Sequence, residues 1–257
     1  MTALLEIDAL TKKFGGLVAV NEFSTRLEAG ELCALIGPNG SGKTTIFNLI
    51  TGIYRPTSGS IHFDGAEIGG ERPDLIAKRG IARTFQNIRL FEGLDVLNNV
   101  LVGYHLRLKA GPFAAVLRMP GYVREEQMMV AQAQELLEAL ELDHLIHEDA
   151  TSLPYGQQRK LEIARALATK PRLLLLDEPA AGMNPEESND LMRFILHILE
   201  TFELTVFLIE HQMRVVMGIC PRIIVIDHGE IIAEGPPEAI QTNQRVIEAY
   251  LGVGEHA

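Results

Sequence analysis

Four short stretches of the chain are continuously apolar, whereas a half-buried strand would alternate apolar and polar residues. Strands that are buried on both faces, as in a parallel sheet covered by helices, have this composition. A buried helical segment is the alternative, but the stretches are shorter than most helices and turn-forming residues flank them. The pattern therefore predicts four strands of a parallel sheet, at Leu32–Ile36, Leu173–Leu176, Val206–Ile209 and Ile223–Ile226.

Two further pairs of strand-like segments are separated by a dipeptide that ends in glycine, which favours a tight hairpin turn. Asp64-Gly65 separates Ser60–Phe63 from Ala66–Ile68, and His228-Gly229 separates Arg222–Asp227 from Glu230–Ala233. The two hairpins predict a small antiparallel β layer beside the parallel core.

Helices are predicted where a capping residue precedes apolar residues at helical spacing. Asn184 is a suitable N-cap, Pro185 suits the first helical position, and Glu186 and Glu187 complement the helix dipole. The apolar face that follows consists of Leu191, Phe194, Ile195, Ile198, Leu199 and Phe202. A second such face consists of Met129, Ala133, Leu136, Leu137 and Leu140.

Strand-like stretches are missing between about residues 93 and 150, where helical patterns dominate. Gly111-Pro112 and Pro120-Gly121 interrupt this region. We therefore expect an α/β core over residues 1–92 and 151–233, a helical subdomain over 93–150 and a C-terminal helical extension over 234–257.

Composition excludes several classes of protein. Hydrophobic residues make up 47% of the 257 residues, yet no stretch approaches the ~18–20 apolar residues that a membrane-spanning helix requires. The formal net charge of −11 argues against nucleic acid as the main ligand. Cys33 and Cys220 are far apart, which disfavours a disulfide framework or zinc site. Residues 1–8 do not resemble a secretory signal, so we expect a soluble cytoplasmic protein.

One segment departs from the acidic balance of the chain. Between Asp95 and Glu125 the only formal charges are basic, at Arg107, Lys109, Arg118 and Arg124. A solvated loop explains this run, and contact with anionic lipid headgroups or an acidic partner is the alternative.

The strongest chemical signal is a glycine-rich motif of the form G-x-x-x-x-G-K-[ST], which follows an apolar strand and precedes a helical pattern. Glycines let the backbone curl so that successive N–H groups face phosphate oxygens, and the helix N-terminus adds a favourable dipole. We expect Lys43 to reach the β- and γ-phosphates and Thr44 to ligate Mg²⁺. The predicted phosphate-binding residues are Gly37, Pro38, Asn39, Gly40, Ser41, Gly42, Lys43, Thr44 and Thr45.

Polar side chains follow three other strand-like stretches, where α/β sheets bind their ligands. Asp177 and Glu178 follow Leu173–Leu176, and we expect Asp177 to hold Mg²⁺ while Glu178 orients or deprotonates an attacking water. Gln86 follows the segment 81–85 as a candidate ligand of Mg²⁺ or water. His211 follows the segment 206–210 as a candidate hydrogen-bond donor, although a lone histidine is more often structural.

Residues 149–159, Asp-Ala-Thr-Ser-Leu-Pro-Tyr-Gly-Gln-Gln-Arg, resemble the LSGGQ signature of the ABC-transporter ATPases. The signature precedes the strand that ends in Asp177-Glu178, as that family requires. The resemblance implies a P-loop NTPase fold, ATP and Mg²⁺ as ligands, and a role for Gln86 and His211 as the family's switch residues. It also implies that Phe14 stacks on adenine, unless Phe14 is a core residue. Tyr155, Gly156 and Gln157 are the signature residues expected to contact nucleotide.

Further segments narrow the resemblance to the ATPases of branched-chain amino acid importers, and among these to the LivG type rather than the LivF type. The segments are Phe-Gly-Gly-Leu-Val-Ala-Val (14–20), Arg-Thr-Phe-Gln-Asn-Ile-Arg-Leu-Phe (83–91), Glu-Pro-Ala-Ala-Gly-Met-Asn-Pro (178–185), Ile-Glu-His-Gln-Met (209–213), Val-Met-Gly-Ile (216–219) and Ala-Tyr-Leu-Gly (249–252).

Two positions depart from the family pattern. Pro154 replaces the serine of the signature and offers neither a hydroxyl nor an N–H, although it can preset the entry into the helix. Asn184 replaces the usual aspartate after the acidic strand, which is consistent with capping rather than with a charged link between subunits.

The resemblance implies partners as well as chemistry. We expect a head-to-tail dimer, formed with a second copy or with a LivF-like chain, in which the signature of one subunit closes the ATP site of the other. Two transmembrane permease subunits, and through them a solute-binding protein, would place the chain at the cytoplasmic face of the inner membrane. The alternatives are the ATPase subunit of another ABC transporter such as a lipopolysaccharide exporter, a soluble ABC ATPase acting on DNA or ribosomes, and a non-catalytic nucleotide-binding regulator.

Overall fold

The computed structural model describes residues 3–107, 117 and 119–251, and the chain forms two compact units. The first unit comprises Met1–Arg83 and Arg172–Ala257, and the second comprises Thr84–Pro171. The second unit contains the predicted helical segment 93–150 and extends beyond it on both sides, because the helix that follows the signature packs against its helices. None of the helices in the described ranges combines the length and apolar character needed to cross a membrane.

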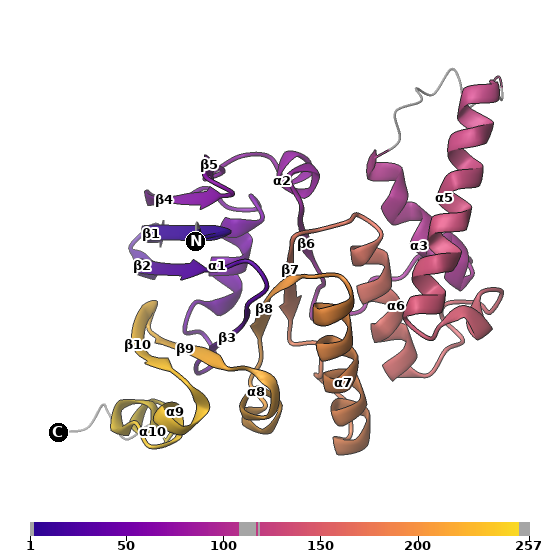
Figure 1. The fold of residues 1–257 in the computed structure, drawn as a ribbon. Coiled ribbons are helices and arrows are strands. Elements are labelled where there is room, and N and C mark those ends of the chain that lie inside the picture. Colours follow the sequence, from indigo (N-terminus) through magenta and orange to yellow (C-terminus); the bar gives the residue numbers. More distant parts are fainter. Residues whose placement is uncertain (1–2, 108–116, 118, 252–257) are drawn as a thin grey trace. The chain divides into compact units, whose positions relative to one another are not determined.

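The main sheet of the first unit has the strand order β10-β9-β3-β8-β7-β6 (Figure 1). Strands β9, β3, β8, β7 and β6 are parallel, and β10 pairs antiparallel with β9 at the edge. All four predicted parallel strands are confirmed. The strands are β3 (Leu32–Ile36), β6 (Ile81–Arg83), β7 (Leu173–Asp177), β8 (Thr205–Ile209), β9 (Arg222–Asp227) and β10 (Glu230–Gly235).

A second, antiparallel sheet of the same unit has the order β2-β1-β4-β5. The predicted hairpin around Asp64-Gly65 is confirmed here as β4 and β5. The hairpin around His228-Gly229 also forms, but it adds β10 to the main sheet rather than to this layer. The strands are β1 (Leu5–Phe14), β2 (Leu17–Leu27), β4 (Ser58–Phe63) and β5 (Ala66–Glu67).

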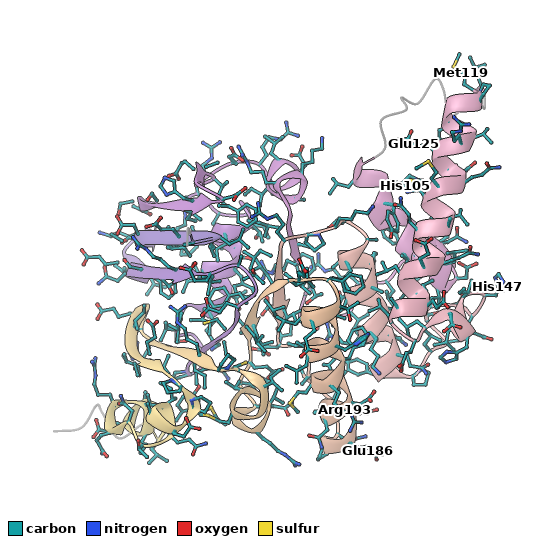
Figure 2. All side chains as sticks on the ribbon, viewed as in Figure 1. His105, Met119, Glu125, His147, Glu186 and Arg193 are labelled. Atoms are coloured by element: carbon teal, nitrogen blue, oxygen red, sulfur yellow. The ribbon has the colours of Figure 1, made fainter. Side chains whose placement is uncertain are left out.

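One apolar core joins the two sheets, with helix α1 (Lys43–Ile50) contributing to it. Alternate residues of β3, Cys33 and Leu35, belong to this core, as the two-residue period of a strand requires. The intervening residues are also buried, so helices must cover the opposite face. Helix α7 (Pro185–Thr201) buries Leu191, Phe194, Ile195 and Ile198 of the predicted face and leaves Glu186 and Arg193 exposed (Figure 2). The other two predicted residues, Leu199 and Phe202, are only half-buried, and Phe202 lies just beyond the end of the helix. The remaining helices of the unit are α2 (Pro73–Arg79), α8 (Met213–Ile219), α9 (Pro237–Gln241) and α10 (Gln244–Leu251).

The second unit is helical. The elements among its described residues are α3 (Val96–Tyr104), η1 (His105–Arg107), α5 (Pro120–Ala139), η2 (Asp143–Leu145) and α6 (Tyr155–Leu167). Helix α3 contacts both α5 and α6. A Cβ atom added at Gly103 of α3 would lie 2.5 Å from the Arg165 carbonyl oxygen, so glycine is what permits the close approach to α6. Pro120 begins α5, as its predicted helix-breaking position implies, whereas Gly111-Pro112 lies outside the described residues.

Candidate functional site

The glycine-rich motif forms a loop between the end of β3 and the start of α1. Gly40 and Gly42 have φ angles of 82° and 107°, in the region that residues with a side chain rarely adopt. A Cβ atom at Gly42 would also lie 2.5 Å from the Ala19 carbonyl oxygen. Backbone conformation and space therefore both require glycine at this position. The loop has the strand–loop–helix context that was predicted for phosphate binding.

Lys43, the first residue of α1, is buried and folds back over the loop. Its ammonium group donates to the carbonyl oxygens of Gly37 and Pro38, each at 2.8 Å. Burial lowers the pKa of Lys43, while the carboxylates of Glu178 and Asp177 oppose that shift. The loop cation and the two acidic residues after β7 thus share one electrostatic environment.

Asp177 ends β7 and forms a nearly buried ion pair with Arg83, at the end of β6. The Oδ2–Nη2 distance is 2.6 Å and each side chain is 6% exposed. Arg83 also donates to Asn48 Oδ1 of α1 at 2.7 Å. One guanidinium therefore connects two strands of the main sheet to the helix that follows the phosphate loop.

Glu178 and His211 lie side by side, as their predicted positions after β7 and β8 require. The distance from Glu178 Oε2 to His211 Nδ1 is 3.4 Å, with the glutamate side chain 15% exposed and the histidine 47% exposed. Glu178 has a φ of 47°, and its N–H donates to the carbonyl of Ile209 at 2.9 Å. A non-glycine residue in this conformation costs about 1–3 kcal/mol, and such residues cluster at active sites.

Sequence reasoning missed Glu210, which precedes His211 and has a fully buried side chain. Its carboxylate accepts hydrogen bonds from the N–H groups of Ala180, His211 and Gln212 at 2.9, 3.0 and 3.2 Å. Burial raises the pKa of Glu210, and the three backbone donors partly oppose that shift. The only available signal was an acidic residue directly after an apolar strand.

Phe14 ends β1 and is 40% exposed, so the interpretation of Phe14 as a core residue is wrong. Its ring meets Tyr54 edge-on, with centroids 5.2 Å apart, and the ammonium of Lys12 lies 4.9 Å from the ring centroid. An exposed aromatic ring held by neighbours is suited to stack on a planar ligand.

The second unit holds Gln86 and the signature. Pro154 is the N-cap of α6, and its carbonyl accepts from the N–H of Gln158 at 3.0 Å, so the proline does mark the helix entry. Tyr155, Gly156 and Gln157 follow as the first turn of α6. Gln86 precedes α3, and its carbonyl oxygen accepts a hydrogen bond from Arg159 at 2.7 Å. Of the basic segment, Lys109, Arg118 and the Arg107 side chain lie outside the described residues.

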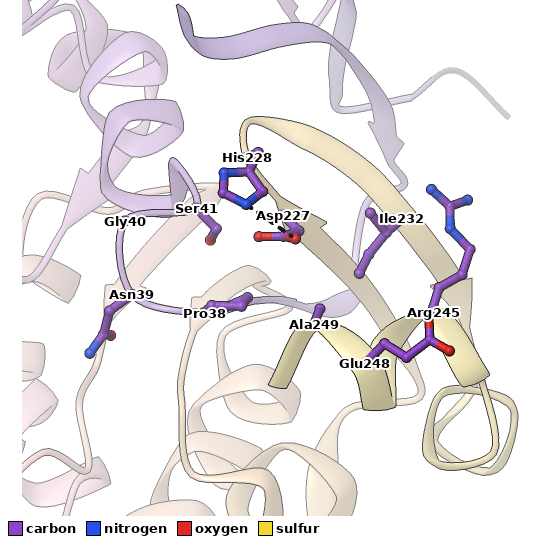
Figure 3. A pocket seen from close by; sticks show the side chains of 10 residues that line it. All are labelled: Pro38, Asn39, Gly40, Ser41, Asp227, His228, Ile232, Arg245, Glu248 and Ala249. Carbon is purple, nitrogen blue, oxygen red and sulfur yellow. Dashed lines mark ion pairs between the residues drawn. The ribbon is translucent and has the colours of Figure 1, made fainter. Parts of the chain in front are cut away.

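A pocket of about 400 Å³ lies beside the phosphate loop (Figure 3). The loop contributes one wall, the β9–β10 hairpin with its Asp227–His228 pair a second, and helix α10 a third. Helix α10, part of the predicted C-terminal extension, therefore lines the pocket beside the loop. Its lining residues from α10 are Arg245, Glu248 and Ala249.

Two family models and several known proteins match this chain. A family model described as ABC transporter matches residues 20–181, and one described as branched-chain amino acid ATP-binding cassette transporter matches residues 230–256. The chain is 46% identical to BraF, a high-affinity branched-chain amino acid transport ATP-binding protein of Pseudomonas aeruginosa, over 97% of this chain and 98% of that protein. It is 44% identical to LivG of Escherichia coli, which bears the same description, over the same shares.

A solved structure agrees with the fold. The ADP conformation of MJ1267, an ATP-binding cassette of an ABC transporter, superposes with a TM-score of 0.86 at 32% identity, covering 98% of this chain and all of that one. The β7 carboxylates, the phosphate loop and the signature of this chain all lie within the segment that the first family model matches.

Proposed function

Since the chain belongs to the ABC transporter family of ATP-binding proteins, we propose that it is the ATP-hydrolysing subunit of an importer for branched-chain or related amino acids. The observation that carries this proposal is the near-complete alignment, at 44–46% identity, with ATP-binding proteins of branched-chain amino acid transport. The separate match of residues 230–256 to a branched-chain transporter model supports the same substrate class.

Nucleotide binding falls to the first unit. The N–H groups of the phosphate loop and the dipole of α1 attract the phosphates, and the Lys43 ammonium adds a buried positive charge. The Lys43 ammonium donates to two loop carbonyls. Phosphate oxygens of a bound nucleotide would replace these carbonyls as the acceptors of its hydrogen bonds. Phe14 offers an exposed face to the adenine ring.

The residues available for Mg²⁺ fit a hard cation that keeps phosphate oxygens among its ligands. Thr44 supplies a hydroxyl at the start of α1, Asp177 supplies a carboxylate at the end of β7, and Gln86 would add an amide oxygen. Mg²⁺ would neutralise charge on the β- and γ-phosphates. The ion pair with Arg83 fixes Asp177 Oδ2, which leaves the other carboxylate oxygen for a ligand.

Hydrolysis requires a group that takes the proton of the attacking water. Glu178 fills this role, because it follows the magnesium carboxylate directly and is mostly withdrawn from solvent. Water oxygen bonds to the γ-phosphorus, its proton passes to Glu178, and the bond to the β-phosphate oxygen breaks, giving ADP and phosphate. His211 lies within 3.4 Å of Glu178 and would donate a hydrogen bond to the γ-phosphate. Gln86 would orient the water or the metal.

The proposal includes partners that one chain does not supply. Tyr155, Gly156 and Gln157 would close the ATP site of a second ATPase subunit, either a copy of this chain or a LivF-like one. Two permease subunits would anchor the dimer at the cytoplasmic face of the inner membrane, with a solute-binding protein on the other side. No nucleic acid takes part.

The test uses the intact complex. The complex is purified from membranes by an affinity tag on this chain, and the co-purifying subunits are identified. Uptake of labelled leucine, isoleucine and valine is then measured in proteoliposomes supplied with ATP. We expect permease subunits to co-purify and uptake to stop in the Lys43→Ala variant. Recovery of a DNA-repair or ribosomal complex in place of a permease would overturn the proposal, and so would ATP-driven export.

A further inference from the structure

Both backbone polar groups of Ala180 are held by the two residues that flank His211. The N–H of Ala180 donates to Glu210 Oε1 at 2.9 Å, and its carbonyl accepts from Gln212 Nε2 at 2.9 Å. Ala180 belongs to the loop after β7, and the flanking residues belong to the loop after β8. Side chains from one loop therefore fix the backbone of the other.

The same two loops are joined once more beside Glu178. Its N–H donates to the carbonyl of Ile209, so three hydrogen bonds connect the loop segment 178–180 with the segment 209–212. The remaining oxygen of Glu210 accepts the N–H groups of His211 and Gln212 at 3.0 and 3.2 Å. The carboxylate thus shapes the turn that carries His211 and ties that turn to the neighbouring loop.

A fully buried carboxylate is costly unless its oxygens are satisfied, and here both of them are. An apolar residue would fill the same space without the desolvation cost, but it would leave three backbone N–H groups without this partner. The hydrogen-bonded carboxylate therefore specifies the geometry of the two loops, which an apolar side chain in the same space would not do.

We propose that Glu210, assisted by Gln212, is a positioning residue for ATP hydrolysis: it holds the loop after β8 against the loop after β7 and so fixes His211 relative to Glu178. The inference rests on the proposed function and adds residues that touch neither nucleotide nor metal. Glu210 acts through the backbone of His211 and of Ala180, two residues beyond Glu178.

The Glu210→Gln variant tests this role selectively. Its single carbonyl oxygen can keep the two bonds to the His211–Gln212 turn, which places the amide NH₂ against the N–H of Ala180 and cuts the tie between the loops. We expect kcat for ATP hydrolysis by the assembled complex to fall by up to about 10²-fold, the scale of a misplacement of about 1 Å. The KM for ATP should change less than about threefold, because Lys43 and the phosphate loop remain intact.

Glu31→Gln is the matched control. Glu31 is a largely buried glutamate of the same unit, its side chain 17% exposed, and it pairs with Arg222 at 2.8 Å. Losing that pair weakens folding without touching either loop, so kcat should stay at the wild-type value. Gln212→Ala provides a second test if Glu210→Gln fails to fold. It removes only the hydrogen bond to the Ala180 carbonyl and keeps the Glu210 carboxylate, so kcat should fall by a smaller factor than the one expected for Glu210→Gln.

A double-variant cycle separates positioning from general stability. His211→Ala should lower kcat strongly in the wild-type background but have little further effect on Glu210→Gln. Additive losses, or an unchanged kcat in Glu210→Gln, would overturn the positioning role while leaving the proposed function intact. If wild-type protein hydrolyses no ATP, or Glu178→Gln hydrolyses it normally, the proposed function itself fails.

Discussion

Arg159 donates to the carbonyl oxygen of Gln86 at 2.7 Å, so the helix of the signature holds the backbone of the predicted switch glutamine. Arg159 is fully buried, binds the Phe85 carbonyl as well, and pairs with Glu162 at 2.7 Å. Glu162 in turn accepts the N–H of Arg89 at 3.2 Å. The segment around Gln86 and the start of α6 therefore form one hydrogen-bonded framework within the second unit.

Replacing Arg159 with methionine should destabilise the second unit strongly. The change leaves Glu162 as a buried carboxylate without its charged partner, which typically costs about 3–5 kcal/mol. Urea denaturation should show this loss, and adding Glu162→Leu should recover part of it. A double variant no more stable than Arg159→Met would contradict the explanation.

The same variant should show a characteristic pH dependence. Burial already raises the pKa of Glu162, and the Arg159 charge opposes that shift, so removing arginine raises the pKa further. A carboxyl with a raised pKa binds more protons folded than unfolded, and stability then falls as pH rises above about 4. We expect Arg159→Met to lose less stability in mild acid than at neutral pH. An equal loss at both would argue against an orphaned carboxylate.

Gly42→Ala should impair both folding and nucleotide binding. The new Cβ meets the Ala19 carbonyl and forces an unfavourable φ, at a cost of about 1–3 kcal/mol. Thermal unfolding and ATP titration measure the two effects. Gly121→Ala on α5 is the control, since a Cβ there meets nothing within 4 Å and should raise stability slightly. Similar behaviour of the two variants would contradict the role of the loop glycine.

Glu178→Gln should leave ATP affinity within a few-fold of wild type and lower turnover by roughly 10²–10⁴-fold, the scale of losing a general base. Phosphate release under saturating ATP, together with a binding titration, makes the comparison. Near-normal hydrolysis would remove Glu178 from its assigned role.

Asn184→Ala should lower stability by about 0.5–2 kcal/mol, because the side chain accepts from the N–H groups of Glu186 and Glu187 in a complete capping box. Asn184→Asp retains the cap and should match wild type in calorimetry. If aspartate destabilised the protein as much as alanine does, capping would not explain asparagine at this position.

The sequence predicted the parallel sheet because its strands are buried on both faces, and it predicted α7 because caps and apolar spacing agree. It did not predict β1 and β2, the antiparallel strands on which Phe14 and Ala19 lie. Their pairing shifts register between Ile7 and Leu10, and Glu22 has a φ of 48°, so the two-residue alternation is interrupted.

The motif residues of the site were predictable, whereas the groups that hold them in place were not. Asp177, Glu178 and His211 lie at or just after strand ends, and Lys43 belongs to a glycine-rich motif, and both patterns are visible in the local sequence. Glu210 acts on the backbone of Ala180, far away along the chain, and no local pattern records such a contact. Arg159 and Glu162 likewise look like an ordinary exposed charge pair until their burial is known.

Two walls of the pocket in Figure 3 lie in segments that different family models match. Its phosphate-loop wall lies in the segment matched by the general ABC transporter model, while Ile232, Arg245, Glu248 and Ala249 lie in the segment matched by the branched-chain model. A ligand of this pocket would therefore contact both the phosphate loop and the segment that the branched-chain model matches.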